Sequence, residues 1–228
     1  MSTEPRFPNR LPGGEPPRSP VGGDSRADLT PRVRPTQKRA EDTVALILDS
    51  TADLLDEIGI HLLNTNKVAE RAKVKVSTIY RYFPNKLALL AALMERLDAE
   101  GMALFEPHIE DLADPANDWR ETWSAMVHDY VNSLSNRHGA LAIRRSVRAL
   151  PELQQIDRRS NEVLAKKIAS ALQKRGANAP LSQLVLVALL LLYSGGAIVD
   201  DHYLHEVAPK IIDEMVLMHL PYLATYLD

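Results

Sequence analysis

From Lys38 onward the apolar residues recur at helical spacing, and this periodicity constrains the fold more than any other feature of the sequence. In the first such segment they fall at i, i+3, i+4, i+7, i+10, i+11 and i+14, namely Val44, Ile47, Leu48, Thr51, Leu54, Leu55 and Ile58. Gly59 follows and favours a helix end there, because glycine readily adopts the conformation of a helix C-cap. No later stretch alternates polar and apolar residues as a strand does. The sequence therefore predicts an all-α protein.

Further helices are predicted from the same spacing and from glycine and proline signals. They run from about Lys86 to Phe105, ended by Pro107; from Asp118 to Arg137; from Ala140 to Leu150; from Pro151 to Arg175, ended by Gly176; from Pro180 to Asp200; and from Ala208 to Leu227, with a kink at Pro221. We expect three parts: an arm over residues 1–36, a small domain of three helices over 37–97, and a larger helical bundle over 98–228.

Composition excludes several classes of protein. The chain has 228 residues, enough for one or two domains, and no cysteine, which excludes disulfides, thiolate zinc sites and cysteine nucleophiles. The start of the chain has no recognisable targeting signal, and the apolar run from Leu184 to Val199 is too short for a membrane span. We therefore expect a cytoplasmic protein with no membrane partner.

The usual catalytic motifs are also missing from the sequence. It contains no glycine-rich phosphate loop, no H-E-x-x-H and no G-x-S-x-G. The stretch DDHYLH at 200–205 has two acids and two imidazoles, but no second cluster completes a metal site, and it is more typical of a helix terminus. We predict no enzyme activity, no cofactor and no metal.

The charge is unevenly distributed. Residues 1–39 hold eight Lys or Arg and four acids, so the other residues hold 19 against 26, a net of −7. Residues 1–36 are rich in Pro, Gly and Arg and poor in large apolar side chains, which is typical of a flexible arm. The basic end of the arm, from Arg32 to Arg39, favours contact with phosphate or the minor groove over a mere solubility tail.

The segment TNKVAERAKVKVSTIYRYFPNK, residues 65–86, has the pattern of a helix-turn-helix. It carries six Lys or Arg, one Glu and three aromatic residues in an acidic protein. Thr65 is a suitable N-cap for a first short helix, Val74 an apolar plug in the turn, and Pro84 a stop after the second helix, VSTIYRYF. Ile79 and Phe83, four residues apart, are predicted to face inward.

The outward face of the second helix is then polar and basic. Short side chains at its start can approach base edges, a guanidinium can pair with guanine, and tyrosine hydroxyls can reach phosphate or bases. The DNA-contacting residues predicted from this pattern are Lys75, Val76, Ser77, Thr78, Tyr80, Arg81, Tyr82 and Lys86, with Arg39 from the arm. On spacing alone, exposed charges that merely solvate a helix face remain an alternative.

The motif V-x-x-x-T-I-Y-R-Y-F-x-N-K-x-x-L resembles the N-terminal domain of the TetR/AcrR family of bacterial transcription regulators over about residues 38–97. The resemblance implies a recognition helix over Val76 to Tyr82, a phosphate contact at Lys86 and a repressor. It also implies that Thr65 and Asn66 face DNA at the start of the first short helix. Two positions depart from the family pattern. Lys73 stands where glycine is usual, and Lys75 where a small N-cap residue is usual.

The bundle offers a dimer surface and, by the same resemblance, a pocket for a small-molecule effector. The run QLVLVALLLLYSGGAIV is apolar almost all round, as expected where one face meets its own core and another a partner. The predicted homodimer interface comprises Leu184, Leu191, Ile211, Met215 and Tyr222, with burial inside one monomer as the alternative. The candidate pocket residues are Trp119, Trp123, Met126, Tyr130, Arg144 and Tyr193, which could equally be core.

The sequence thus predicts a dimeric regulator that binds a near-palindromic operator in double-stranded DNA and is released by a small molecule. The alternative is a helical small-molecule-binding protein or enzyme whose basic helices bind an acidic protein partner.

Overall fold

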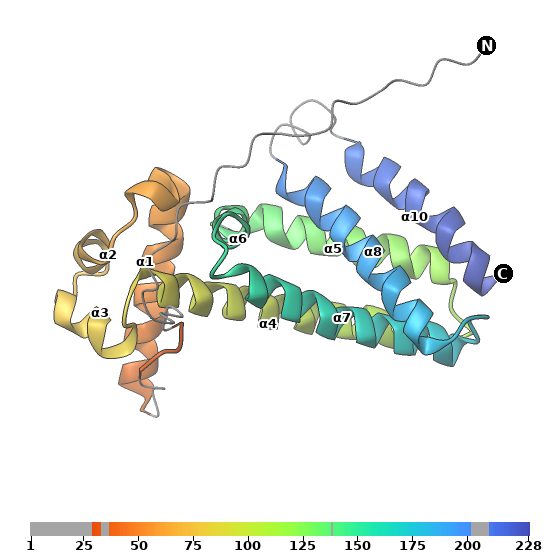
Figure 1. The fold of residues 1–228 in the computed structure, drawn as a ribbon, viewed down its shortest axis with the longest axis horizontal. Helices are drawn as coiled ribbons and strands as arrows, with labels where there is room; N and C mark the ends of the chain where they lie inside the picture. Colours follow the sequence, from red (N-terminus) through yellow and green to blue (C-terminus); the bar gives the residue numbers. More distant parts are fainter. Residues whose placement is uncertain (1–28, 33–36, 138, 202–209) are drawn as a thin grey trace, which may run out of the picture.

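The computed structural model describes residues 29–32, 37–137, 139–201 and 210–228. Every regular element in these ranges is a helix. In chain order they are α1 (Lys38–Leu62), α2 (Thr65–Arg71), α3 (Val76–Tyr82), α4 (Lys86–Ala113), α5 (Trp119–Asn136), α6 (Ala140–Ala149), α7 (Gln154–Arg175), α8 (Leu181–Asp200) and α10 (Ile211–Leu227). The predicted fold class is confirmed: three N-terminal helices are followed by a larger helical bundle (Figure 1).

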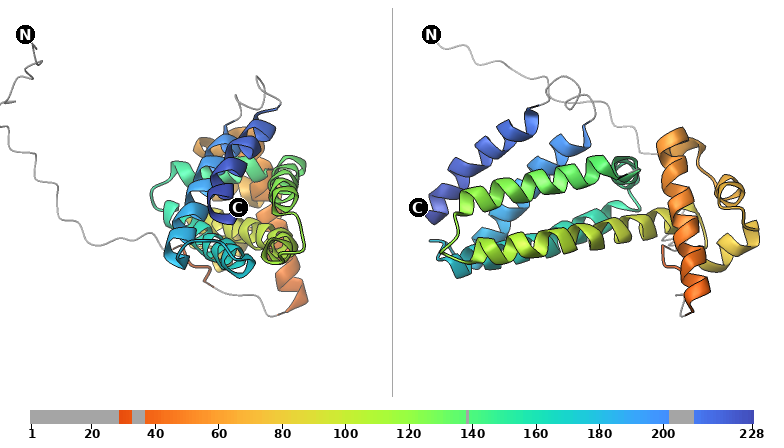
Figure 2. Two further views of the ribbon diagram at one scale, coloured as in Figure 1. Left: turned by 90° about the vertical axis from the view of Figure 1, so that its right-hand side faces the viewer. Right: turned by 180° about the vertical axis from the view of Figure 1, so that it is seen from behind.

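The first three helices form a small head at one end of the molecule. Its core is built from the side chains that helical spacing places inward, and Ile47, Val68 and Ile79 are each fully buried. Gly59 has φ of 69°, so the regular helix breaks where the sequence predicts, and a short turn continues to Leu62. Figure 2 shows α1 lying across the ends of the long helices of the body.

Helix α4 joins the head to the body as one continuous rod. It passes through Pro107, so the prediction of a helix end near Phe105 is wrong. The apolar stripe continues past the proline through Ile109 and Leu112, both buried, and this packing holds the last two turns in place. The helix also crosses the predicted domain boundary between residues 97 and 98 without a break.

The body consists of α5 to α8 and α10 around the C-terminal part of α4. Its main contacts are between α7 and α8 and between α4 and α7 (Figures 1 and 2). Helix α7 begins at Gln154 and not at Pro151, because Leu150 and Leu153 first close a tight turn through a 2.9 Å backbone hydrogen bond. Gly176, with φ of 106°, ends it as predicted.

Helix α8 has the length and composition of a membrane span, the only such case among the described helices. In the structure it packs on α7 through one face, which buries Leu184, Val187, Ala188, Leu191, Gly196 and Val199. The start predicted at Ala208 for the last helix lies outside the described residues, and α10 is described from Ile211.

Candidate DNA-binding surface and ligand cavity

Helices α2 and α3 form the predicted helix-turn-helix. Asn64, rather than Thr65, caps α2, because the Asn64 side chain accepts a 3.0 Å hydrogen bond from the backbone N–H of Lys67. Thr65 is the first helical residue, and its hydroxyl lies 3.1 Å from the Tyr80 hydroxyl. This contact ties the start of α2 to the exposed side of α3.

The turn between the two helices is made by Lys73, Val74 and Lys75. Lys73 has φ of 53° and is the only non-glycine residue with positive φ in the described ranges. Val74 packs on the head core, as the apolar plug of the turn should. Lys75 is the N-cap of α3 and makes no side-chain cap, so the first N–H groups of α3 have no side-chain partner at this position.

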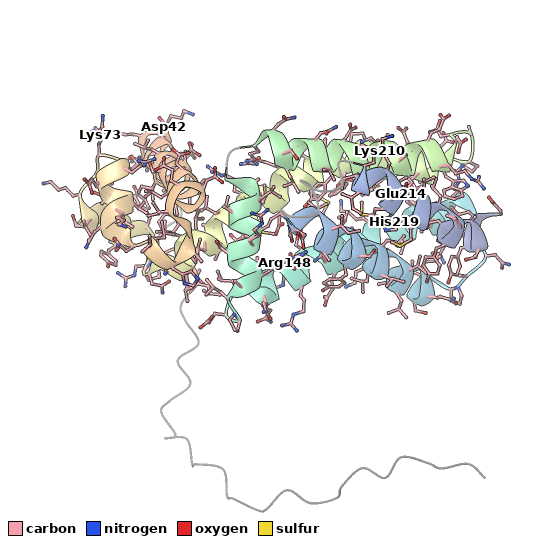
Figure 3. The ribbon with its side chains drawn as sticks, turned by 90° about the horizontal axis from the view of Figure 1, so that it is seen from above. Asp42, Lys73, Arg148, Lys210, Glu214 and His219 are labelled. Carbon is pink, nitrogen blue, oxygen red and sulfur yellow. The ribbon has the colours of Figure 1, made fainter. Side chains whose placement is uncertain are left out.

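One face of α3 is exposed, as the sequence predicts. Ser77, Tyr80 and Arg81 are exposed together with Lys73 and Lys75 of the turn. In Figure 3 Lys73 lies at the outer end of the head, away from the body. Val76 and Thr78 are half-buried.

Tyr82 departs from the prediction, because it is only 4% exposed and packs within the head core. With 3.6 residues per turn, positions 79, 82 and 83 share the inner face of α3. The placement of Tyr82 among the DNA-facing residues is therefore wrong.

The residues on either side of this face differ in exposure and in hydrogen bonding. Asn66 and Arg39 are exposed. Lys86 is half-buried, and its ammonium group donates a 3.3 Å hydrogen bond to the Ile60 carbonyl at the end of α1. Asn85 caps α4 by accepting a 2.9 Å hydrogen bond from the Ala88 N–H.

Arg32 contacts the carboxyl end of α3, a role that the sequence did not indicate. Its backbone N–H donates to the Tyr82 carbonyl at 2.8 Å, and its guanidinium donates to the Tyr80 carbonyl at 3.3 Å. A cation is favourable at the carboxyl end of a helix. Residues 1–28 and 33–36, which include most of the predicted arm, lie outside the described residues.

An apolar cavity of about 70 Å³ lies inside the body, lined by residues of α4 to α8 and α10. Four predicted pocket residues line it: Trp123, Met126, Tyr130 and Arg144. Lining residues that the sequence analysis missed include Phe105, Asn161, Leu191, Gly195, Met215 and His219. They come from four helices far apart in the chain, and helical spacing alone does not bring them together.

Trp119 and Tyr193, by contrast, do not line the cavity. Trp119 is buried at the start of α5, where the Arg120 guanidinium lies 4.3 Å from its ring centroid. Tyr193 is 42% exposed on the outer face of α8. The pocket prediction is therefore wrong for these two residues.

A buried ion network closes the end of the cavity nearest to α6. The Arg144 guanidinium donates to Asp200 at 2.8 Å and to the Tyr130 hydroxyl at 2.7 Å. The other carboxylate oxygen of Asp200 lies 2.5 Å from Arg148, which also lies 3.5 Å from Asp157. Burial acts against the charged form of Arg144, but Tyr130 and Asp200 raise its pKa above the ordinary value.

Gly196 makes room for this network. A Cβ atom there would lie 2.6 Å from the Arg148 guanidinium, so any other residue would force this side chain to shift. Figure 3 shows Arg148 on α6 between the head and the body. The network therefore joins the last turn of α8 to the helix that borders the head.

Among the described residues no group of three or more His, Asp or Glu side chains could hold a metal ion. His202 and His205 of the DDHYLH stretch lie outside the described residues.

Comparison with known proteins places the helix-turn-helix. The family model for bacterial regulatory proteins of the tetR family matches residues 47–93, which contain α2 and α3. The tetracycline repressor protein class G of Vibrio anguillarum is 36% identical over 102 residues, which is 45% of this chain and 43% of that protein. The repressor KstR of Rhodococcus jostii (strain RHA1) is 44% identical over 59 residues, 24% of this chain and 28% of that protein. The match thus spans less than half of each of these relatives.

A solved structure extends the likeness to the body. The TetR-family transcriptional regulator from Streptomyces coelicolor is 27% identical, with a TM-score of 0.59, over 83% of this chain and 100% of that one. The chain is thus similar to TetR-family regulators in its head and in the fold of its body. Regulators of the TetR family bind operator DNA and small-molecule ligands and act as dimers.

The predicted dimer residues fall into two groups in the structure. Leu184, Leu191 and Met215 are 0%, 4% and 4% exposed, so they pack in the core of their own protomer, and their prediction as interface residues is wrong. Ile211 and Tyr222 are half-buried. The exposed apolar side chains of these helices are instead Leu186, Leu190 and Tyr193 on α8 and Leu217 and Met218 on α10.

Proposed function

We propose that the protein is a sequence-specific, dimeric transcriptional repressor that works in the cytoplasm, binds a near-palindromic operator through α3, and leaves it when a small molecule occupies the cavity. The observation that carries this proposal is the exposed face of α3. There, Ser77, Tyr80 and Arg81 stand together, flanked by Lys73 and Lys75, on a head of the TetR type.

The residues of this face divide into two roles. Ser77 and Arg81 are suited to base edges, since a short hydroxyl side chain permits close approach and a guanidinium can form two hydrogen bonds with guanine. Thr65, Asn66, Lys73, Lys75 and Arg39 are suited to the phosphate backbone, which fixes the position of α3 in the groove. The half-buried Val76 and Thr78 would contact bases or sugars only at the start of the helix, and Lys86 would reach phosphate only by leaving the Ile60 carbonyl.

Two copies are needed, because one seven-residue helix contacts only a few base pairs. Dimeric helix-turn-helix proteins place their two reading helices about 34–36 Å apart, one turn of the duplex. The exposed apolar side chains of α8 and α10 supply a face that a second copy would cover, with Ile211 and Tyr222 at its border.

Helix α6 is placed to carry the effector signal. Its apolar side chains Ile143 and Val147 belong to the same core cluster as the head, while Arg144 lies at the cavity. A ligand that displaces α6 would therefore move the head relative to the body. To release DNA, the ligand must bind the displaced state more tightly by a few kcal/mol, since it shifts the equilibrium only by its differential affinity.

The test compares salt dependence and base preference in matched variants. Wild-type protein should bind duplex DNA with log affinity that falls linearly with log salt. Lys75→Ala should weaken binding to all sequences and lower that slope by about one unit, whereas Arg81→Ala should leave the slope nearly unchanged and relax the preference at one base pair.

Equal behaviour of the two variants would contradict this division of roles. Binding that does not depend on salt would favour the alternative function, in which the basic helices contact an acidic protein.

A further inference from the structure

Three polar atoms on the cavity wall have no hydrogen-bond partner among the described residues. They are the indole nitrogen of Trp123, the amide nitrogen of Asn161 and Nδ1 of His219, and all three atoms are buried. Trp123 and His219 are each 2% exposed. Buried polar groups in native proteins are nearly always paired, so three unpaired ones around one cavity point to a bound molecule that pairs them.

Two of these atoms lie on neighbouring rings. The ring centroids of Trp123 and His219 are 5.9 Å apart, in an edge-to-face arrangement. Figure 3 shows His219 on α10.

The hydrogen bonds of Ser194 fix the role of each His219 nitrogen. The Ser194 hydroxyl donates to the Leu191 carbonyl at 3.0 Å and lies 3.2 Å from Nε2 of His219. A hydroxyl has one proton to donate, so Ser194 accepts from the Nε2–H, and Nδ1 of the neutral ring carries a free lone pair. Burial lowers the pKa of His219 to about 4, which keeps the ring neutral at neutral pH. The wall therefore presents an acceptor at His219 and donors at Trp123 and Asn161.

The described residues that line the cavity offer no unpaired charged side chain to an ionic ligand. Arg144 is the only Lys, Arg, Asp or Glu among the described lining residues, and Asp200 and Tyr130 already occupy it. Behind it, two arginines face two aspartates, so the network of Arg144, Arg148, Asp157 and Asp200 is balanced. A carboxylate or an ammonium group would have to enter unpaired or break this network, and an unpaired buried charge is strongly unfavourable.

We propose that the cavity binds an uncharged, largely apolar molecule whose hydroxyl group, or another group that both donates and accepts, pairs with His219 Nδ1 and the indole N–H of Trp123. The proposal rests on the proposed function in taking this cavity as the effector site. The rings of Phe105, Trp123 and Tyr130 supply flat apolar surface for the body of the ligand.

The first experiment compares matched probes on the full-length protein without DNA. Two skeletons are used, each as alcohol, carboxylate and ammonium: naphthalenemethanol, naphthoate and naphthylmethylammonium, and decanol, decanoate and decylammonium. The chain has two tryptophans, so NMR of the indole N–H groups gives one signal from the cavity wall and one internal control, Trp119.

At least one alcohol should bind about tenfold more tightly than both of its charged counterparts and shift the Trp123 resonance without shifting that of Trp119. A charged member that binds as tightly as the alcohol, an alcohol that leaves the Trp123 resonance in place, or no binding by either alcohol would overturn the proposal.

The second experiment uses two substitutions of His219. Asparagine carries its side-chain oxygen as many bonds from the backbone as Nδ1, whereas glutamine places its amide at the distance of Nε2. His219→Gln should keep the Ser194 contact and weaken alcohol binding by about tenfold, and His219→Asn should keep most of the binding. Equal losses in the two variants, or no loss in either, would contradict the pairing. If His219→Gln does not fold, Trp123→Phe takes its place, with the same expected loss.

DNA binding by the same samples separates this inference from the proposed function. The His219 and Trp123 variants should bind DNA as wild type does, because both residues lie in the body, away from α3. A wild-type protein that binds DNA but shows no preference for the alcohols overturns only the ligand class. Failure of the wild-type protein to bind DNA counts against the proposed function, whatever the cavity binds.

Discussion

At the scale of single residues, a lysine occupies the left-handed position in the turn between α2 and α3. Lys73 has φ of 53°, a conformation that costs a residue with a Cβ about 1 kcal/mol relative to glycine. Its side chain is exposed beside Lys75 and the outer face of α3. A charge kept at a strained position is expected where it serves binding more than stability.

Lys73→Gly should therefore raise the free energy of unfolding by about 0.5–1 kcal/mol and weaken DNA binding, since it removes both the strain and a phosphate contact. Lys73→Ala is the matched control, because it removes the charge but keeps the strain. Denaturant unfolding and a DNA titration check both effects. If Lys73→Gly bound DNA as tightly as wild type, the lysine would have no role at the phosphate backbone.

Asp98 sets a pH dependence of stability. Burial raises its pKa to about 6, against the smaller effects of the Ser160 hydrogen bond and Arg144. Between about pH 4 and pH 6 the folded state thus holds the proton that the unfolded state has released. The contribution of Asp98 to the free energy of unfolding therefore falls as the pH rises through this range. Asp98→Asn should remove this fall and gain about 2 kcal/mol relative to wild type between these pH values.

Denaturant unfolding of both proteins across this pH range measures the difference. His219 acts in the opposite sense, because its pKa of about 4 makes the folded state less stable as the pH falls below about 6.5. The comparison of variant and wild type cancels this contribution. A difference that does not change with pH would mean that the Asp98 carboxyl is solvated.

At the scale of elements, α4 connects the head to the body as one continuous helix. It includes Pro107, which cannot donate a helical hydrogen bond and whose ring crowds the Ala103 carbonyl. The helix continues because buried Ile109 and Leu112 hold its last turns against the body. Tertiary packing thus outweighs a local signal that ordinarily ends a helix.

Pro107→Ala should raise the free energy of unfolding by about 1–3 kcal/mol, because it restores a helical hydrogen bond and removes the crowding. The gain is reduced by the loss of the proline ring, which restricts the unfolded chain. Glu110→Ala, an exposed change on the same helix, should stay within about 0.5 kcal/mol of wild type. Urea unfolding compares them. A destabilised Pro107→Ala would show instead that the packing of the body requires the proline.

The same balance explains which parts of the molecule could be predicted from the sequence. Helix ends set by local chemistry were predicted well, as at Gly59 and Gly176, where glycine takes a positive φ. The ends at Pro107 and Pro151 depend on packing partners elsewhere in the chain. Periodicity also predicts the exposed face of α3, except for Tyr82, which the helical spacing itself places beside Ile79 and Phe83 on the inner face.

The cavity was the least predictable part, for a physical reason. The side-chain chemistry of Trp123 and Arg144 is enough to make them pocket candidates. The cavity wall also includes His219 and Asn161, which come from helices that meet only in the folded body. An apolar helix such as α8 likewise does not reveal which side faces its own core. The structure places Leu191 inside and Leu190 outside, one residue apart.

At the scale of the whole molecule, the proposed function describes a DNA-reading head on a body that pairs with a second copy. The head and α6 share one apolar cluster, which also includes the cavity residues Val131, Val199 and Met215. The exposed apolar side chains of α8 and α10 remain uncovered in one protomer. Their burial in a dimer would set the spacing of the two α3 helices.

Leu190→Glu tests this face. A carboxylate in the middle of an apolar interface should convert a dimer into a monomer and weaken operator binding by at least about tenfold, because one head then binds alone. Val163→Glu changes a similarly exposed apolar residue on α7 and should leave the mass unchanged. Light scattering gives the mass of each protein. A monomeric wild type would remove the basis for two-headed binding.

Selection of bound duplexes from random DNA measures the central claim most directly. If two copies of α3 read one turn of DNA apart, the selected sites should contain two inverted half-sites whose centres lie about 10 base pairs, or a multiple, apart. A pool without a shared sequence, or with a single unpaired half-site, would contradict it.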